Sequence, residues 1–129
     1  MTIKRAQQEF KPRDWPTITP RMVVSDARGL VGFLQNVFGA TGNLQSDAPA
    51  IMQIGDSKIM VSDTSSRDAT RTFLYVYVED ANETYRRALK AGASSLEEPI
   101  DLPYGDRRAM VQDPWGNTWQ IATRLRGDV

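Results

Sequence analysis

One stretch decides the fold of this chain: PYGDRRAMVQDPWGNTWQI, residues 103–121. Within it, the run Asp113-Pro114-Trp115-Gly116-Asn117 combines residue types that favour tight turns. On either side, residues 107–112 and 118–125 have the composition of short strands, with aromatic and β-branched side chains among them. We therefore expect two strands joined by this turn.

Outward from this stretch, the same order of elements occurs twice along the chain. Expected strands over residues 17–24 and 71–78 are each followed by an aspartate, Asp26 or Asp80. Each aspartate predicts a helix N-cap, because its carboxylate can accept from free backbone N–H groups. Glycine tolerates the left-handed conformation that ends many helices. Each expected helix ends at a Gly-Ala pair: Gly39-Ala40 and Gly92-Ala93.

The two halves also continue alike after their helices. In the first half, we expect a loop over residues 41–49, then strands over 50–54 and 58–62 joined by a Gly-Asp-Ser turn. In the second half, a longer loop over residues 95–106 precedes the final two strands. Each half thus has the order strand, helix, strand, strand, with space for one more strand in the loop. Two such half-covered sheets would bury their faces against each other or against a partner.

Two pairs of residues qualify the expected helices. Asp80 and Glu83 are three residues apart and predict a capping pair at the start of the second helix. Gly29 and Gly32 lower the helix propensity of the first helix. We interpret these glycines as positions where the helix packs closely on the sheet.

Composition places the chain among ordinary globular proteins. Its 129 residues suit one compact domain, with 40% hydrophobic and 25% charged residues. Basic and acidic residues both number 16, so the formal net charge is zero. This balance argues against nucleic acid or an anionic membrane as a partner. No apolar stretch has the length needed to span a bilayer.

The polar start of the chain predicts an N-terminal arm over residues 1–16, which contains Pro12 and Pro16. Residues 17–129 are then expected to form a single domain, with repeat halves over about 17–63 and 71–125. The first 13 residues carry charges but lack the apolar core of a signal peptide. We therefore expect a cytoplasmic protein, and the absence of cysteine agrees with this expectation.

The duplicated unit, closed by DPWGNTWQI at residues 113–121, resembles the vicinal oxygen chelate superfamily. This superfamily includes glyoxalase I, bleomycin-resistance proteins, fosfomycin-resistance proteins and extradiol dioxygenases. The resemblance covers residues 17–125 and points to the small single-domain branch. It implies an α+β fold in which paired βαβββ repeats form a curled mixed sheet, the glyoxalase/bleomycin-resistance-like fold. It also implies a ligand-holding cup, commonly at the interface of a homodimer.

The resemblance further implies four positions that supply metal ligands in the metal-using members. One lies in the first strand and one in the last strand of each half. In this chain they fall on Thr19, Met60, Phe73 and Gln120. A phenyl ring offers no lone pair, a thioether is a poor ligand for a hard cation, and the chain has no histidine. We therefore predict no metal cofactor, with a divalent metal in an all-oxygen site as the alternative.

Strand alternation predicts which side chains line the cup, because successive residues point to opposite faces. Aromatic rings with a few oriented polar groups suit a small, partly aromatic ligand. The expected ligand-binding residues are Thr19, Arg21, Met60, Phe73, Tyr75, Tyr104 and Gln120. Tyr104 is included because its loop borders the pocket in the related proteins. No catalytic residue is assigned.

These features favour a metal-independent homodimer that binds a small drug or metabolite, as in the bleomycin-resistance branch. One alternative is an enzyme of the same superfamily: a metal-dependent lyase, isomerase or dioxygenase with an atypical site, or acid–base chemistry through Tyr75, Tyr104 and Gln120. Another alternative is a structural or regulatory dimer with a vestigial cavity. Serine–histidine and cysteine–histidine catalysis are excluded, because the chain contains neither histidine nor cysteine.

Overall fold

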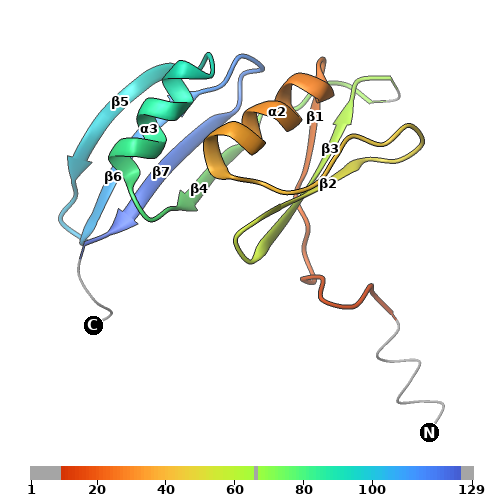
Figure 1. The fold of residues 1–129 in the computed structure, drawn as a ribbon, viewed down its shortest axis with the longest axis horizontal. Coiled ribbons are helices and arrows are strands. Elements are labelled where there is room, and N and C mark those ends of the chain that lie inside the picture. The colour runs from red at the N-terminus through yellow and green to blue at the C-terminus, as the bar shows by residue number, and fades with distance from the viewer. Residues whose placement is uncertain (1–9, 66, 126–129) are drawn as a thin grey trace, which may run out of the picture.

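The computed structural model describes residues 10–65 and 67–125, which form two sheets and two helices (Figure 1). A three-stranded sheet has the order β1-β3-β2 and a four-stranded sheet has the order β4-β7-β6-β5. The elements run in the order β1 (Arg21–Val24), α2 (Ala27–Phe38), β2 (Ala50–Ile54), β3 (Ser57–Asp63), β4 (Phe73–Tyr77), α3 (Ala81–Lys90), β5 (Ser94–Asp101), β6 (Asp106–Gln112) and β7 (Thr118–Arg124).

Both sheets are mixed and share one topology, which confirms the expected α+β fold of paired repeats. In each half the first strand runs parallel to the last strand: β1 pairs with β3, and β4 pairs with β7. The remaining pairs are antiparallel. Helix α3 crosses one face of the four-stranded sheet, and α2 lies beside it, next to the three-stranded sheet (Figure 1).

The halves differ in the element after the helix. The further strand that the expected loop over residues 95–106 left room for is present: Ser94–Asp101 forms the edge strand β5, and residues 102–105 form the rest of the connection. Two glutamates and a proline weaken the strand propensity of β5, but backbone pairing with β6 outweighs that preference, with two register shifts. In the first half, the corresponding segment contributes a single bridge between Thr41 and Gln53.

Most expected strand bounds hold within two residues, and β1 is the exception. It begins at Arg21 rather than at residue 17. Pro20 has no N–H to donate to a neighbouring strand, although its carbonyl still accepts from the Met60 N–H at 2.9 Å. Strand β4 is also shorter than the expected 71–78, and β3 extends one residue beyond the expected 58–62 at each end.

Both predicted N-caps form, but of the predicted capping pair only the bond to the Asp80 carboxylate is present among the described residues. Asp26 accepts from the Gly29 N–H at 2.9 Å, and α2 ends at Gly39, whose φ of 67° is left-handed. Asp80 accepts from the Glu83 N–H at 3.1 Å. The Glu83 carboxylate pairs with Arg86 at 2.9 Å. Neither helix in the described part of the chain is long and apolar enough to cross a membrane.

Only one of the two α2 glycines is closely packed. A Cβ at Gly29 would lie 2.6 Å from the Trp115 ring and would also collide with the Asp26 carboxylate. A Cβ at Gly32 would meet nothing within 4 Å, so the expectation of close packing was wrong there. Gly29 therefore makes room for the β6–β7 turn, and the sheet itself is not the neighbour.

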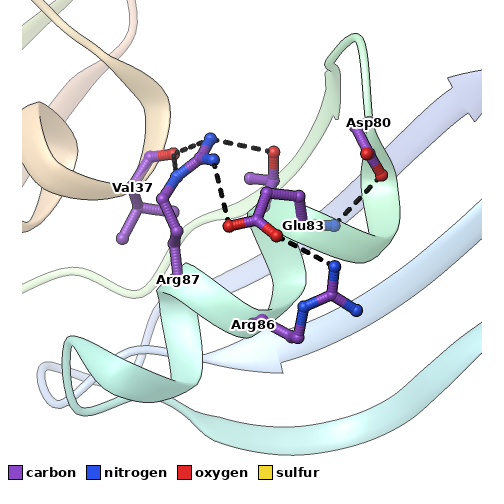
Figure 2. A network of polar contacts seen from close by, with 6 residues as sticks. Val37, Asp80, Glu83, Arg86 and Arg87 are labelled. Atoms are coloured by element: carbon purple, nitrogen blue, oxygen red, sulfur yellow. Dashed lines mark hydrogen bonds and ion pairs between the residues drawn. The ribbon is translucent and has the colours of Figure 1, made fainter.

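The core joins the two halves through aromatic rings and one arginine. Trp119 of β7 is fully buried, with its ring centre 5.0 Å from that of Phe38 at the end of α2. Figure 2 shows Arg87 of α3 reaching the same end of α2, where its guanidinium donates to the Val37 carbonyl at 3.0 and 3.2 Å. A cation at a helix C-terminus complements the helix dipole, so this contact fixes α3 against α2.

The expected arm lies partly outside the described residues, which begin at residue 10. Its described part is attached through Trp15, whose ring lies 5.7 Å from the Lys58 ammonium of β3. Lys11 also donates to the Trp15 carbonyl at 2.6 Å. The last four residues of the expected domain, 126–129, also lie outside the described part.

Candidate functional site

Strand β4 presents a row of aromatic rings on the face of its sheet that the helices leave uncovered. Leu74, Val76 and Val78 point toward the core, whereas the residues between them point away from it. The exposed residues are Phe73 (67%), Tyr75 (38%) and Tyr77 (60%). Large rings gathered on one exposed face mark interaction sites more often than rings scattered singly.

A buried carboxylate organises this row from the neighbouring strands. Asp106, the first residue of β6, is fully buried, and its Oδ2 accepts from the Tyr75 hydroxyl at 2.6 Å and the Tyr77 hydroxyl at 2.7 Å. Its Oδ1 accepts from Arg124 of β7 at 3.1 Å. The Tyr104 and Tyr75 hydroxyl oxygens are 3.0 Å apart. We call these five residues, Tyr75, Tyr77, Tyr104, Asp106 and Arg124, the tyrosine–aspartate cluster.

Sheet pairing places the members of the cluster on one face. Asp106 lies opposite Arg124 in the β6–β7 ladder, and Tyr75 lies opposite Gln120 in the β4–β7 ladder. Arg124 also donates to the Tyr104 carbonyl at 2.7 Å, which attaches the preceding loop to β7. The Gly105 N–H donates to the Leu102 carbonyl at 3.0 Å, within the turn that places Tyr104 beside Asp106.

The contacts of the cluster fix its protonation. Burial alone would raise the pKa of Asp106, but hydrogen bonds from Tyr75, Tyr77 and Arg124, with the Arg124 charge, outweigh burial and lower this pKa. Burial of the hydroxyl, together with hydrogen bonds to Asp106 and Tyr104, raises the pKa of Tyr75 far above its usual value. The hydrogen bond to Asp106, followed by burial, raises the pKa of Tyr77. At neutral pH the carboxylate is therefore ionised and both phenols are neutral.

The structure brings together the predicted site residues of the second half. Tyr75 and Tyr104 are in hydrogen-bond contact, Gln120 is the β7 partner of Tyr75, and Phe73 lies two residues before Tyr75 on the same face. The predicted residues of the first half lie in or next to the other sheet: Thr19, Arg21 and Met60. There, Arg21 is the strand partner of Met60 and donates to the Ser62 hydroxyl at 3.0 Å, and Thr19 precedes β1.

A cavity of about 920 Å³ lies along β4, between the two halves. Ile18 and Pro20 line it from the segment before β1, and Ile59 lines it from the β2–β3 hairpin. On the β4 side it is lined by the consecutive residues 74–78, which include the core-facing Leu74, Val76 and Val78 as well as Tyr75 and Tyr77. The helices also contribute to this lining, through Phe38 of α2 and through Thr84 and Arg87 of α3. Of the other predicted residues, Arg21 lines a separate cavity of about 310 Å³ beside the 44–49 loop.

The donor set at the four family metal positions does not fit a divalent ion. Thr19, Met60, Phe73 and Gln120 bring no carboxylate, imidazole or thiolate. The Arg21 guanidinium, on the strand residue paired with Met60, adds a positive charge there. Within residues 10–65 and 67–125, no three His, Cys, Asp or Glu side chains gather as a metal site would require.

The predicted site residues do not include three members of the cluster: Asp106, Tyr77 and Arg124. Strand alternation places Tyr77 on the cup face with Tyr75, and Arg124 on the same face as Gln120, so only the position of Asp106 was missed. Asp106 was placed in a loop, although it begins β6. Extending the expected strand back by one residue would have placed Asp106 on the same face as Arg108 and Met110, next to the cup-facing side of β7. That alternation was the available signal.

Comparison with known proteins agrees with this geometry. The model of the Glyoxalase/Bleomycin resistance protein/Dioxygenase superfamily matches residues 17–121. The chain belongs to this superfamily. Uncharacterized proteins of Mycobacterium bovis and Mycobacterium tuberculosis are 26% identical to it over 129 residues. These alignments cover 86% of this chain and 85% and 76% of the mycobacterial proteins, respectively.

Solved structures of other proteins share this fold. TioX from Micromonospora sp. ML1 aligns with a TM-score of 0.72 and 25% identity, over 85% of this chain and 99% of TioX. A glyoxalase/bleomycin resistance protein/dioxygenase family enzyme from Burkholderia phytofirmans aligns with a TM-score of 0.69 and 21% identity, over 81% and 95% of the two chains. The expected glyoxalase/bleomycin-resistance-like fold is thereby confirmed.

Proposed function

We propose that this superfamily member is a metal-independent binder of a small, partly aromatic molecule, a drug or a metabolite, and that it acts as a homodimer. The homodimer follows from the resemblance to the bleomycin-resistance branch. A binder of this kind needs no catalysis, because occupancy alone lowers the free concentration of its ligand.

One observation carries the binding proposal: the exposed rings of β4 are held in place by a buried, ionised carboxylate. The Tyr75 and Tyr77 hydroxyls both donate to Asp106, so these rings keep their orientation without a ligand. A ligand that stacks on them pays little for ordering side chains, which favours affinity. The cavity of about 920 Å³, which has Tyr75 and Tyr77 among its lining residues, has the size of a small-molecule site.

The metal-dependent and acid–base alternatives find less support. The four family positions offer no suitable donor set for a divalent ion. An acid–base role for Tyr75 is disfavoured because its proton is engaged by Asp106 and its pKa is raised, so it is not a base at neutral pH. If no ligand binds in the experiment below, the remaining alternative is a structural or regulatory dimer with a vestigial cavity.

The test is a thermal-shift screen of aromatic antibiotics and metabolites, followed by titration calorimetry of each stabilising compound with and without EDTA. We expect stoichiometric binding that EDTA leaves unchanged. Tyr77→Ala should weaken binding about tenfold or more through lost stacking area. Leu96→Ala, which truncates an exposed side chain of β5, is the control and should bind normally.

Two results would overturn the proposal. The first is a screen in which no compound stabilises the protein. The second is binding that disappears with EDTA, or stoichiometric nickel, zinc, manganese or iron in the purified protein. Size-exclusion chromatography with light scattering tests the homodimer separately, and a monomer at assay concentrations would remove that part alone.

A further inference from the structure

The phenol protons of the tyrosine–aspartate cluster all point toward its buried end. A phenol carries one proton, and an ionised carboxylate only accepts. Tyr75 and Tyr77 both give their protons to Asp106 Oδ2, at 2.6 and 2.7 Å. The Tyr75 oxygen must therefore accept in its 3.0 Å contact with Tyr104, so the Tyr104 hydroxyl is the donor there. The direction of each hydrogen bond follows from the proton count.

This direction decides what the exposed end of the cluster offers a ligand. Tyr77 is 60% exposed and Tyr104 is 53% exposed, and their oxygens keep lone pairs but no free proton. The exposed rings beside them add electron-rich faces. Three side chains on this face also carry donors. Gln120 has both a donor and an acceptor. Arg108 donates through Nη2 to Glu97, but its buried Nε has no partner among the described residues. Arg124 uses Nη1 in its contacts with Asp106 and the Tyr104 carbonyl.

We infer that the site, taken as the binding site proposed above, selects aromatic ligands that donate hydrogen bonds, such as phenols and aromatic amines. An O–H or N–H group on the ligand would meet phenol oxygens that can only accept. An ether or carbonyl in the same place would meet lone pairs and lose its own hydration without replacement. The inference names the ligand class and depends on the proposed binding function.

Asp106→Asn should reverse this polarity while conserving shape. Arg124 donates to Oδ1 at 3.1 Å, so the asparagine carbonyl is expected to occupy that position and its NH₂ to face the tyrosines. The amide would then donate to the tyrosine oxygens, and the phenol protons would turn outward. The exposed end of the cluster would change from acceptor to donor.

The test uses 2-naphthol and 2-methoxynaphthalene, which share a ring system and differ in one hydrogen-bond donor. Affinities are measured by calorimetry at pH 7 for the wild type and three variants. We expect the wild type to prefer 2-naphthol by about tenfold or more. Tyr77→Phe should reduce this preference by removing one acceptor, and Asp106→Asn should abolish or invert it. Tyr85→Phe is the control and should keep the wild-type preference, because its hydroxyl donates to Ser95 on α3's side of the sheet.

Each outcome separates the inference from the proposed function. Equal affinity for the two probes in the wild type overturns the inference alone. So does failure of 2-naphthol to bind while the aromatic screen yields ligands. If neither probe binds and no compound in the screen stabilises the protein, the proposed function itself is overturned. If Asp106→Asn fails to fold, as judged by circular dichroism, Tyr77→Phe still decides the matter, and an unchanged preference in that variant contradicts the inference.

Discussion

The two halves of this protein share a topology but differ in chemistry. Arg21 lies opposite Met60 in the first sheet, just as Tyr75 lies opposite Gln120 in the second. At these matched positions the first half has a cation and a thioether, whereas the second half has a phenol and an amide. Duplication therefore fixed where side chains point, but not what they can bind.

One further pair of matched positions shows how the chemical difference between the two halves arises. Ile51 lies beside Met60, and Met110 lies beside Gln120. Four residues before each of them is an aspartate: Asp47 in a loop and Asp106 in β6. Strand β6 has seven residues and an outer neighbour, β5, whereas β2 has five residues and a single bridge on that side. The longer, better paired strand carries its aspartate into the protein interior.

The largest difference between the halves in the stability cost of a matched substitution is expected at their hairpin turns. Asp113 is buried and accepts from the Trp115 and Asn117 N–H groups and the Trp119 indole, each at 2.9 Å. Asp113→Ala would leave these donors unpaired, and we expect a loss of about 3–4 kcal/mol in the free energy of unfolding. The matched change Asp56→Ala, in the exposed β2–β3 turn, should stay within about 0.5 kcal/mol. Urea denaturation of both variants provides the measurement, and similar losses would contradict the comparison.

Alanine substitution of the matched aspartates Asp106 and Asp47 should give the next largest difference in the free energy of unfolding. Asp106→Ala removes the acceptor of three donors at a fully buried position, and we expect a loss of about 2–3 kcal/mol by urea denaturation. Asp47→Ala changes an exposed loop residue and should cost less than about 0.5 kcal/mol. A cost for Asp106→Ala as small as that for Asp47→Ala would show that the cluster does not stabilise the fold.

The sequence predicted the parts of the fold that depend on local chemistry. Asp26 and Asp80 cap their helices through residues three positions ahead, and the turn at Asp113 is also local. The extra strand β5 was expected only as a possibility within a loop, without bounds, because pairing with β6, and not its own composition, makes it a strand. In the candidate site, alternation correctly placed Phe73, Tyr75 and Gln120 on one face. Asp106 was missed because its partners are 18 to 31 residues away in sequence.

The helices of the two halves offer a third comparison, since α2 contains two glycines and α3 contains none. Gly29→Ala should lower the free energy of unfolding by about 1–2 kcal/mol, because its Cβ would lie 2.6 Å from the Trp115 ring. Gly32→Ala has open space around its Cβ and should raise the free energy of unfolding by about 0.5–1 kcal/mol. Thermal denaturation of both variants tests this, and shifts in the same direction would contradict the packing difference.

The smallest expected effect is a difference in how acid weakens the two halves. Hydrogen bonds and the Arg124 charge hold the folded-state pKa of Asp106 below its unfolded value, despite burial. At a pH between the folded-state and unfolded-state pKa values, the unfolded chain binds more protons than the folded chain. The stability that Asp106 contributes is therefore complete above its unfolded-state pKa of about 3.9, and it is lost as the pH falls through its folded-state pKa.

We therefore expect a shallower loss of unfolding free energy with falling pH in Asp106→Asn than in the wild type, in urea denaturations from pH 5 downward. Some dependence should remain in Asp106→Asn, because the ion pair with Arg107 also lowers the pKa of Asp101. Equal slopes in the wild type and Asp106→Asn would mean that Asp106 titrates alike in the folded and unfolded chains. The buried carboxylate would then not be the feature that distinguishes the second half.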